Sequence, residues 1–486
     1  MVVGVGQVLQ RTEDLAESRE PVDLMADAVA AAAADAGPAG RLLAAVESVR
    51  VVRVLSWRYP DPGRLVADRV GARPRHTAVT GTGGQSPQAV VDRTGAAIAA
   101  GDLDVAVVCG AEAWRTRTRW RRAGERPPWT PWDDAAPAPD EVIGRDLDLS
   151  APEEQAVGLG LPVQLYPIFE SALRAAAGRS VADHQAHLGR LWAGFSEVAA
   201  ANPWAWLRER RTAEEIATPS PANRMVGFPY PKLMNANNDV DMAAALVLCS
   251  AERAEALGVG RDRWVFVHAG AEADDPLVSH RGDLRSSPAI RAAGRAALEL
   301  AGVGVGDLAH VDLYSCFPSA VQVAAAELGI GLDRPLTVTG GLSFAGGPWN
   351  DYVTHAVAGM VGRLRETGGV GLVTANGGFL TKHAVGVYGA GPPAEPFRWA
   401  GVQDEADAAP RREVVAGWDG PATVEGLTVV HDRDGAPETA FVAALTADGR
   451  RAWATTREPD ALVAMTTAEV VGRPVRLAGT TVADVC

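Results

Sequence analysis

The sequence Gly83-Gly84-Gln85-Ser86-Pro87-Gln88-Ala89-Val90, continued by Gly101-Asp102-Leu103-Asp104-Val105-Ala106-Val107-Val108-Cys109-Gly110-Ala111-Glu112, decides the fold. It predicts a tight glycine turn, then a helix over residues 86–100 with Pro87 in its first turn, where proline is tolerated. The nearly all-apolar run 103–109 is typical of a strand covered on both faces. A glycine turn followed by a helix and a buried strand indicates a layered α/β fold.

The second half of the chain repeats this unit. Gly340-Gly341 and Gly346-Gly347-Pro348 precede a predicted helix over residues 350–365 and an apolar strand over 370–374, which runs into Asn376-Gly377-Gly378. Two copies of one turn–helix–strand unit predict an internal duplication.

Between these units the α/β pattern is interrupted from residue 112 to about 230. Residues 114–140 are rich in Trp, Arg and Pro and have weak periodicity, which is typical of a long loop. Residues 166–200 read as one helical segment. Its His184 and His187 share a helical face, but no carboxylate or cysteine in the pattern completes a metal site, so a packing or surface role is expected.

The remaining strands and helices are expected on either side of these units. Strands are expected at residues 2–6, 49–55 and 310–314, and helices at residues 21–36 and 287–301. Regular α/β segments are expected at residues 243–249 and 263–269. After Pro393 the pattern changes. Alternating segments over 422–430, 439–445 and 451–455, separated by Asp-Gly turns, predict a small all-β barrel-like module. The acidic stretch 403–410 is expected to be its linker or an early loop of it.

Composition narrows the function classes. The chain has 486 residues, 47% of them hydrophobic, and a net charge of −14. An acidic chain has no general attraction to nucleic acid, and no segment predicts insertion into a membrane. The four cysteines lack ligand or disulfide spacing, which argues against a zinc site and favours a reducing compartment. No leader precedes the first apolar run, so the cytoplasm is the expected location.

The ordered motifs resemble the thiolase superfamily across roughly residues 1–392. The turn and helix at Gly83 resemble the nucleophile segment of thiolases, and residues 234–241 resemble the end of their loop domain. Residues 312–317 resemble the Asn-Glu-Ala-Phe motif, Gly340 to Pro348 the Gly-Gly…Gly-His-Pro motif, and residues 376–378 the turn after the second cysteine. Residues 228–234 are similar to the branch called thiolase-like proteins, in which an extra C-terminal β domain also occurs.

The resemblance implies a duplicated five-layer αβαβα fold with a loop domain, plus a small C-terminal OB-like barrel. It divides the chain into residues 1–262, with the loop domain at about 112–235, then 263–392 and 393–486. By the same resemblance, the nucleophilic cysteine position is Gly83, the histidine position is Gly347, and the second cysteine position falls at or beside Ala375. Since all three functional side chains are missing, the ordinary thiolase reaction lacks chemical support.

Other side chains are candidates for a different reaction. Tyr314, His355, His383 and Cys316 are the catalytic candidates. For Tyr314 and His355 packing in the core is the competing interpretation, and for Cys316 a small packing residue. Ser86 is either a substrate contact or a helix N-cap. The substrate-binding candidates are Gly83, Gly84, Ser86, Gly347, Asn350, Asn376, Gly377, Gly378 and Lys382.

The resemblance implies a coenzyme A thioester as ligand and no covalently bound cofactor or metal. Three functions stay open. The first is acid–base chemistry on a carbon–carbon bond of an acyl-CoA, of the retro-aldol or Claisen type. The second is an acyltransferase with a relocated nucleophile, and the third is a non-catalytic acyl-CoA or lipid-binding scaffold. Because thiolase-like aldolases can require an OB-type partner, such a partner is also a candidate, and the protein is expected to be a monomer or a homodimer.

Overall fold

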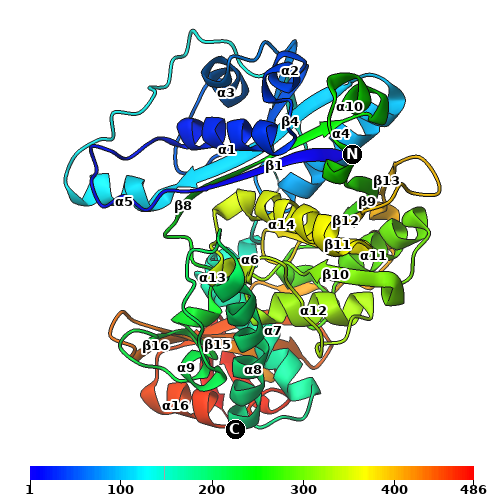
Figure 1. The fold of residues 1–486 in the computed structure, drawn as a ribbon. Coiled ribbons are helices and arrows are strands. Elements are labelled where there is room, and N and C mark those ends of the chain that lie inside the picture. The colour runs from blue at the N-terminus through cyan, green and yellow to red at the C-terminus, as the bar shows by residue number, and fades with distance from the viewer. Residues whose placement is uncertain (147, 486) are drawn as a thin grey trace.

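The computed structural model describes residues 1–146 and 148–485, and Figure 1 shows two sheets with helices between and outside them. The first sheet has the order β1-β8-β4-β2-β3-β5. Its strands are β1 (Val2–Leu9), β8 (Asp241–Cys249), β4 (Val105–Ala113), β2 (Ser48–Val51), β3 (His76–Thr80) and β5 (Glu141–Ile143). Every residue of β4 is buried, as its apolar sequence predicts.

The second sheet repeats the first. Its order is β10-β11-β12-β9-β13, with β10 (Leu308–Asp312), β11 (Val370–Gly377), β12 (Lys382–Gly389), β9 (Phe266–Asp274) and β13 (Arg398–Gly401). In the first sheet β1 pairs antiparallel with β8, and β8 pairs antiparallel with β4, the strand after the glycine-turn helix. In the second sheet β9, β12 and β11 pair in the same way. On their other sides β4 pairs parallel with β2, and β11 pairs parallel with β10. The predicted duplication is therefore confirmed.

Helices form three layers around the two sheets. The helices that follow the two glycine turns, α4 (Ser86–Ala100) and α14 (Tyr352–Thr367), each pack against strands of both sheets and so form the middle layer. The outer layers are α1 (Pro21–Asp35), α2 (Ala39–Ala44) and α3 (Pro62–Val70) on one side, and α11 (Pro288–Ala301) and α12 (Pro318–Leu328) on the other (Figure 1). This is the expected five-layer arrangement.

The segment between the two halves is more helical than its sequence predicts. It contains α5 (Trp114–Arg122), α6 (Pro152–Ala156), α7 (Pro162–Ala176), α8 (Val181–Ala201), α9 (Ala213–Ala217), β6 (Met225–Gly227), β7 (Tyr230–Pro231) and η1 (Lys232–Met234). The single helix expected over residues 166–200 is wrong. It is divided because Gly178 has a φ of +62° and Ser180 caps α8 by accepting a hydrogen bond from the Asp183 N–H.

The C-terminal strands close into a five-stranded barrel. β15 (Gly420–His431), β16 (Pro437–Thr446), β17 (Arg451–Thr456), β19 (Thr481–Val485) and β18 (Pro474–Ala478) pair in that order, and β18 pairs back onto β15. α16 (Pro459–Thr467) connects β17 to β18, while α15 (Gln403–Asp407) and β14 (Val414–Val415) precede the barrel. The all-β module is confirmed. Its last two strands, with only short alternation, were not expected from the sequence.

Short elements complete the chain: α10 (Ala251–Leu257), α13 (Gly341–Phe344), η2 (Arg261–Arg263), η3 (Val278–His280), η4 (Val305–Asp307) and η5 (Trp349–Asp351). The boundaries at residues 262 and 392 and the loop-domain limits remain predictions. In the described part of the chain, no helix is long and apolar enough to cross a membrane.

The barrel packs on α7 and on the segment after β9. Trp453 of β17 donates a hydrogen bond to the Ser279 hydroxyl over 2.8 Å, and Arg174 of α7 forms a bidentate ion pair with Glu469 at 2.8 and 3.0 Å. The Leu427 N–H of β15 donates to a side chain of α7 as well. Because Trp453 belongs to the main hydrophobic core, the barrel shares a continuous interior with the rest of the molecule.

Candidate functional site

The Gly83 turn lies between β3 and α4 and is held by side chains from distant elements. The Gly83 N–H donates to Asn350 Oδ1 over 3.0 Å. The Thr82 carbonyl accepts from Lys382 Nζ over 2.9 Å, and the Thr82 N–H donates to Asp146 Oδ1 over 2.6 Å. Asn350 also donates to the Arg53 carbonyl, so its amide is used to hold the turn.

Ser86 is not the helix cap that its sequence position suggests. α4 begins at Ser86, and the N-cap is Gln85, without a side-chain capping bond. The buried Ser86 hydroxyl donates to the Gly81 carbonyl over 2.9 Å. The capping prediction is therefore wrong, because Ser86 is the first residue of α4 and its hydroxyl closes the turn instead.

The side chain of Gln85 occupies the space beside Gly83. A Cβ atom built on Gly83 would lie 2.0 Å from Gln85 Oε1, and one built on Gly377 would lie 2.1 Å from the same atom. Gln85 Oε1 is buried and has no hydrogen-bond partner among the described residues. A carboxamide therefore fills the volume in which a side chain at residue 83 would lie.

Gly83→Cys is expected to lower the free energy of unfolding by about 1–3 kcal/mol, because residue 83 has a φ of +144° and its Cβ collides with Gln85. Gln85→Ala in the same chain should recover part of that loss by removing the collision, while the backbone strain remains. Equilibrium urea denaturation of both single variants and the double variant measures the coupling. Strictly additive effects would show that Gln85 does not occupy this space.

Tyr314 reaches the adjacent glycine. A Cβ atom built on Gly84 would lie 2.4 Å from the Tyr314 hydroxyl oxygen and 2.4 Å from the Asn376 carbonyl oxygen. Tyr314 follows β10, and its N–H is held by Thr374 Oγ1 at 2.8 Å. Burial, and secondarily the nearby Cys316, raises the pKa of Tyr314 well above its usual value. The phenol is therefore protonated and placed against the turn.

Asn376 and Cys316 meet on the far side of this turn. Asn376 Nδ2 donates to the Tyr166 hydroxyl over 2.9 Å and lies 3.7 Å from Cys316 Sγ. Asn376 Oδ1 is buried and has no partner within residues 1–146 and 148–485. Burial raises the pKa of the Cys316 thiol to about 12, which disfavours the nucleophilic thiolate.

Tyr166 of α7 organises the turn after β11, although sequence patterns did not single it out. Its hydroxyl accepts from the Leu380 N–H over 3.0 Å and donates to the Gly378 carbonyl over 3.3 Å. Leu380 has a φ of +60°, a rare conformation for a branched residue. Tyr166 thus stabilises a strained turn that carries three of the predicted substrate-binding residues, Asn376, Gly377 and Gly378.

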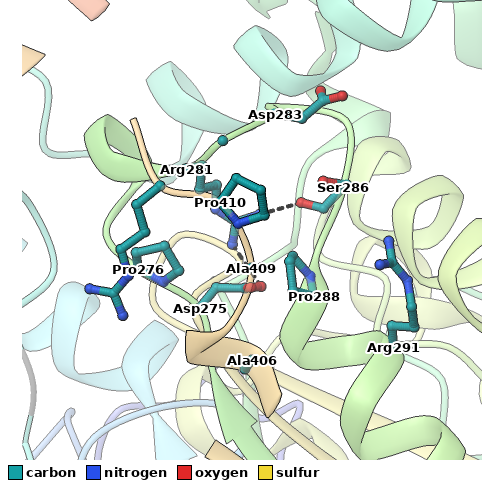
Figure 2. A pocket seen from close by; sticks show the side chains of 12 residues that line it. Asp275, Pro276, Arg281, Asp283, Ser286, Pro288, Arg291, Ala406, Ala409 and Pro410 are labelled. Carbon is teal, nitrogen blue, oxygen red and sulfur yellow. Dashed lines mark hydrogen bonds and ion pairs between the residues drawn. The ribbon is translucent and has the colours of Figure 1, made fainter. Parts of the chain in front are cut away.

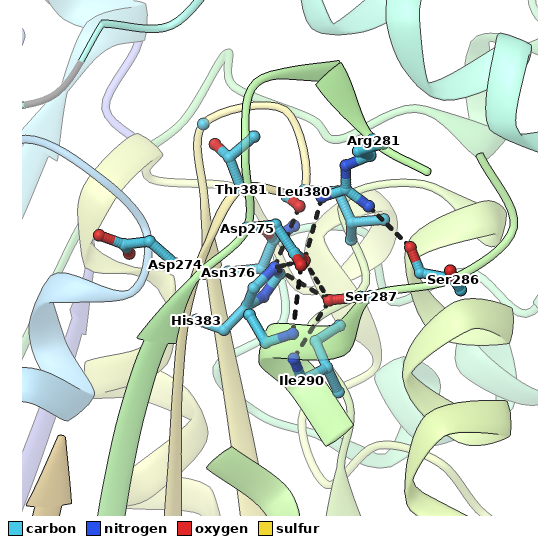
Figure 3. Close-up of polar contacts among 12 residues, drawn as sticks. Asp274, Asp275, Arg281, Ser286, Ser287, Ile290, Asn376, Leu380, Thr381 and His383 are labelled. Atoms are coloured by element: carbon cyan, nitrogen blue, oxygen red, sulfur yellow. Dashed lines mark hydrogen bonds and ion pairs between the residues drawn. The ribbon is translucent and has the colours of Figure 1, made fainter. Parts of the chain in front are cut away.

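His383 belongs to a buried polar network on β12, shown in Figure 3. Its Nε2 lies 3.0 Å from the Leu380 carbonyl, 3.3 Å from Asp275 Oδ2 and 3.5 Å from Ser287 Oγ. Because the carbonyl and the carboxylate only accept, Nε2 carries the proton. His383 Nδ1 is buried without a partner in the described part of the chain, so its lone pair is free.

Asp275 orients this histidine from the end of β9. Its carboxylate also accepts from Ser287 Oγ, from the Ala289 N–H at 3.1 Å and from Arg281 at 3.2 Å. Burial alone would raise the pKa of Asp275, but the Arg281 guanidinium and His383 outweigh it, so the net pKa is lowered. The ionised carboxylate fixes which ring nitrogen of His383 is protonated.

Tyr314 and His383 line the same enclosed cavity. The cavity measures about 10 Å³ and is also lined by Thr374, Asn376 and Leu380. This is the volume of roughly one water molecule. Tyr314, His383 and Asn376 therefore contribute to the walls of one small space, and the Tyr314 hydroxyl also lies against Gly84.

His355 and Gly347 lie apart from this cavity. His355 Nδ1 is 2.8 Å from Gln7 Oε1 on β1, and its Nε2 is 3.8 Å from Asp351 Oδ2. Gly347 is enclosed by the loop before β8, since its Cβ would lie 2.8 Å from Asn238 Oδ1. The structure thus brings Tyr314 and His383 together but places His355 between α14 and the first sheet.

His355 should make the fold sensitive to acid. Burial lowers the pKa of His355 from 6.5 to about 3. Below pH 6.5 this histidine is therefore protonated in the unfolded chain but not in the folded chain. The unfolded state then holds more protons, and stability falls as the pH falls from 6.5 towards 3. Between pH 7 and pH 5 the free energy of unfolding should fall by on the order of 2 kcal/mol from this cause, and His355→Gln should not show that fall. Urea denaturation at both pH values measures it, and an equal pH dependence of both proteins would contradict it.

Lys382 lines an open groove of about 260 Å³ next to the start of α4. Gln85, Ser86, Arg145 and Asp274 line the same groove. Burial lowers the pKa of Lys382 and raises the pKa of Asp274, and each is partly offset by neighbouring charges. The groove thus lies on the outer side of the turn that Lys382 holds.

The two histidines of α8 belong to the packing of the loop segment. His184 Nε2 lies 2.7 Å from Glu170 Oε1, and the same carboxylate accepts from Tyr230 and Gln322. The ring centroids of His184 and His187 are 5.8 Å apart. Among the described residues, no group of three His, Cys, Asp or Glu side chains has the geometry to hold a metal ion.

The duplicated fold and the glycine turn without a cysteine define a thiolase-like protein that lacks the thiolase residues. The crystal structure of a monomeric SCP2-thiolase-like protein type 1 (STLP1) from Mycobacterium smegmatis is 32% identical, with a TM-score of 0.83 over 99% of this chain and 98% of that chain. The family of the additional C-terminal domain of thiolase-like protein type 1 matches residues 401–480. The chain belongs to the SCP2-thiolase-like protein type 1 family.

A solved structure of lower identity shares the fold over most of the chain, and a curated protein matches a shorter part of its sequence. The Ltp2–ChsH2(DUF35) aldolase is 21% identical, with a TM-score of 0.58 over 80% of this chain and 97% of that chain. A curated acetyl-CoA acetyltransferase from Methanothermobacter thermautotrophicus is 28% identical over 191 residues, 36% of this chain and 48% of that protein. The match therefore spans about half the length of the curated relative.

Proposed function

We propose that this protein acts on a coenzyme A thioester by acid–base chemistry at a carbon–carbon bond, without an acyl-enzyme. The observation that carries the proposal is that Tyr314 and His383 line one cavity, while the Tyr314 hydroxyl lies against Gly84. Cys316, whose Sγ lies 3.7 Å from Asn376 Nδ2, has a pKa raised to about 12 by burial, which argues against covalent catalysis.

In this proposal Tyr314 donates a hydrogen bond to the thioester carbonyl oxygen. Its raised pKa keeps the phenol protonated, so it acts as a donor and not as a base. Such a donor stabilises the enolate oxygen that develops when the bond next to the thioester breaks. The carbonyl oxygen of the substrate would occupy the cavity that Tyr314 lines.

His383 is the proposed general base. Asp275 and the Leu380 carbonyl hold its Nε2 proton, which leaves the Nδ1 lone pair free to accept a proton. With a β-hydroxyacyl-CoA, Nδ1 removes the hydroxyl proton, the bond between C2 and C3 breaks, and a carbonyl compound leaves. The enolate then takes up a proton to give the shortened acyl-CoA, which completes a retro-aldol cleavage.

The barrel supports the same class of chemistry. Its closing order, with a helix between the third and fourth strands, is that of an OB-type Greek-key barrel. One solved structure with a similar fold is named the Ltp2–ChsH2(DUF35) aldolase. We infer that the fused barrel replaces a separate OB-type partner. We also infer that the protein acts as a monomer, because its Mycobacterium smegmatis relative is described as monomeric. The proposed location is the cytoplasm.

Incubation with a series of β-hydroxyacyl-CoA thioesters tests the reaction. Mass spectrometry should detect a shortened acyl-CoA and an equimolar carbonyl product, while the intact protein mass stays unchanged. A stable increase in protein mass by the acyl group would overturn the non-covalent mechanism. It would favour the acyltransferase alternative, for which Cys316→Ala must abolish transfer.

A non-catalytic acyl-CoA or lipid-binding scaffold is the second candidate. It is favoured by Gln85, which fills the position of the lost nucleophile, and by the small volume of the enclosed cavity. Calorimetry distinguishes the two. Binding of a β-hydroxyacyl-CoA without any product after prolonged incubation would support the scaffold, whereas cleavage supports the enzyme.

A further inference from the structure

The segment between β9 and α11 connects the barrel to His383. It contains η3, Asp275 and Arg281, and Figure 2 shows Arg281 between Asp275 and Ser286. On one side this segment contacts the barrel, and on the other side it contacts the buried network of Figure 3. It is therefore the route by which the barrel can affect the proposed base.

The barrel holds the backbone around Arg281. Arg451 of β17 is fully buried, and its Nη1 donates to the carbonyl oxygens of Val278, Ser279 and Arg281 at 2.8–2.9 Å. The Trp453 indole N–H donates to the Ser279 hydroxyl over 2.8 Å. Two side chains of the barrel thus fix the stretch of chain from which the Arg281 side chain projects.

The Arg281 guanidinium reaches from this stretch to Asp275. Its Nη2 lies 3.2 Å from Asp275 Oδ2, and its Nη1 donates to the Ser286 carbonyl over 3.0 Å. The same Asp275 oxygen accepts from Ser287 and lies 3.3 Å from His383 Nε2. One carboxylate oxygen therefore joins Arg281 to His383.

The charges of Arg281 and Asp275 cancel each other inside this network. The two side chains are 2% and 0% exposed, so a single charge left there would cost free energy. Burial acts to raise the pKa of Asp275, but Arg281 and then His383 outweigh it, and the net pKa is lowered. Because the ion pair needs no further charge, His383 can keep one proton on Nε2 and none on Nδ1.

The other charged groups near Arg281 and His383 have partners of opposite charge. Arg451 pairs with Glu425 at 2.7 Å, Glu327 with Arg291 at 2.7 Å, and Asp274 with Arg145 at 3.5 Å, while Lys382 interacts electrostatically with Asp274 and Asp146. These pairs leave Arg281 as the counter-ion of Asp275.

Loss of Arg281 would leave the Asp275 carboxylate buried without its counter-ion. A proton would then replace the guanidinium charge, either on His383 Nδ1 or on Asp275 itself. A protonated Asp275 can donate to Nε2, which moves the ring proton of His383 to Nδ1. In both cases the free lone pair at Nδ1 is lost.

We propose that Arg281 is a positioning residue that keeps His383 Nδ1 free of a proton, and that the barrel holds Arg281 in place through Arg451. Because it concerns His383 as the proposed base, this role rests on the proposed function. It gives the barrel a part in the reaction although no barrel residue lines the cavity of Tyr314 and His383.

Histidine-selective nitrogen NMR of the full-length protein tests this role without any substrate. At about pH 8 an ordinary histidine is neutral, and the His383 signals are assigned by their loss in His383→Asn. Nδ1 of His383 is expected to be unprotonated in the wild type and in Arg281→Lys, which retains the charge. It is expected to be protonated in Arg281→Gln.

Arg285→Gln is the matched control, because Arg285 is half-exposed in the same segment and pairs with Asp283 instead of Asp275. Its His383 signals should equal those of the wild type. An unprotonated Nδ1 in folded Arg281→Gln, or an equal change in Arg285→Gln, would overturn the role of Arg281. A protonated Nδ1 in the wild type would overturn the proposed base itself.

Arg451→Met combined with Glu425→Gln tests the contribution of the barrel. The double variant removes both charges of the buried ion pair, so neither is left alone, but three carbonyls lose their donor. A signal of protonated Nδ1 is expected to appear. A spectrum identical to that of the wild type, from a folded double variant, would exclude the barrel from this role.

Cleavage assays separate the role of Arg281 from the proposed reaction. If the NMR results are as expected but the wild type cleaves no β-hydroxyacyl-CoA, the proposed reaction fails and the role of Arg281 in the network stands. If cleavage occurs, Arg281→Gln should lower kcat by about 10-fold or more with little change in KM, as for other residues that orient a functional histidine. Arg281→Lys should recover most of that loss.

Discussion

Arg451→Ala is expected to lower the free energy of unfolding by about 3–5 kcal/mol, the largest stability effect of any single change considered for this chain. Arg451 of β17 is fully buried and forms a bidentate ion pair with Glu425 of β15, both contacts at 2.7 Å. Its Nη1 also donates to the carbonyls of Val278, Ser279 and Arg281 at 2.8–2.9 Å. One guanidinium therefore ties the barrel to the segment that leads to Asp275.

The cost is large because alanine leaves a nearly buried carboxylate and three carbonyl oxygens without their donor. Equilibrium guanidinium denaturation measures the loss. If the barrel unfolds before the rest of the molecule, the loss of stability should appear in the earlier transition. Arg450→Ala is the matched control, since the adjacent arginine pairs with Asp448 near the surface and should contribute less than about 1 kcal/mol. Equal losses in both variants would refute the anchoring role of Arg451.

Tyr314→Phe and His383→Asn are each expected to reduce the rate of carbon–carbon bond cleavage in the acyl-CoA by at least about 100-fold, the usual range for a lost proton-transfer group or oxyanion donor. Tyr314→Phe removes one hydroxyl from the cavity beside Gly84 and keeps the ring. His383→Asn removes the free Nδ1 and retains a side chain that can donate to Asp275. In both variants kcat should fall while affinity for the acyl-CoA changes little.

His355→Gln and Tyr352→Phe are the matched controls. Both residues are buried and polar, but His355 contacts Gln7, and the Tyr352 hydroxyl contacts Thr339 and Asp312. Neither lines the enclosed cavity. They should lose stability and keep kcat within a few-fold. A similar fall in kcat in all four variants would mean that packing, and not proton transfer, explains the effect.

The local structure and its repetition could be predicted from the sequence. The apolar runs that became β4 and β8, the glycine turns and the helices after them depend on residues close together in the chain. Strand and helix periodicity encodes burial at this range, so the duplicated α/β layers and the C-terminal β module were predictable. The absence of a cysteine between residues 76 and 90 also needed no structure.

Which of the candidate side chains lie close together was determined only by the tertiary structure. Tyr314, His355 and His383 were all catalytic candidates in the sequence, but sheet register and the rotation of α14 bring only Tyr314 and His383 of these three to one cavity. Gln85 carried no signal for its place beside Gly83, and neither did Asp275 for its contact with His383.

These contacts join residues far apart in the chain, such as Gly83 and Asn350 or Tyr166 and Asn376. No local pattern encodes such a meeting, because a side chain reaches its partner only after both sheets, the middle helices and the loop segment have packed together. The sequence by itself therefore determined a thiolase-like fold without a thiolase nucleophile. Only the packing of that fold determined which side chains lie at the glycine turn.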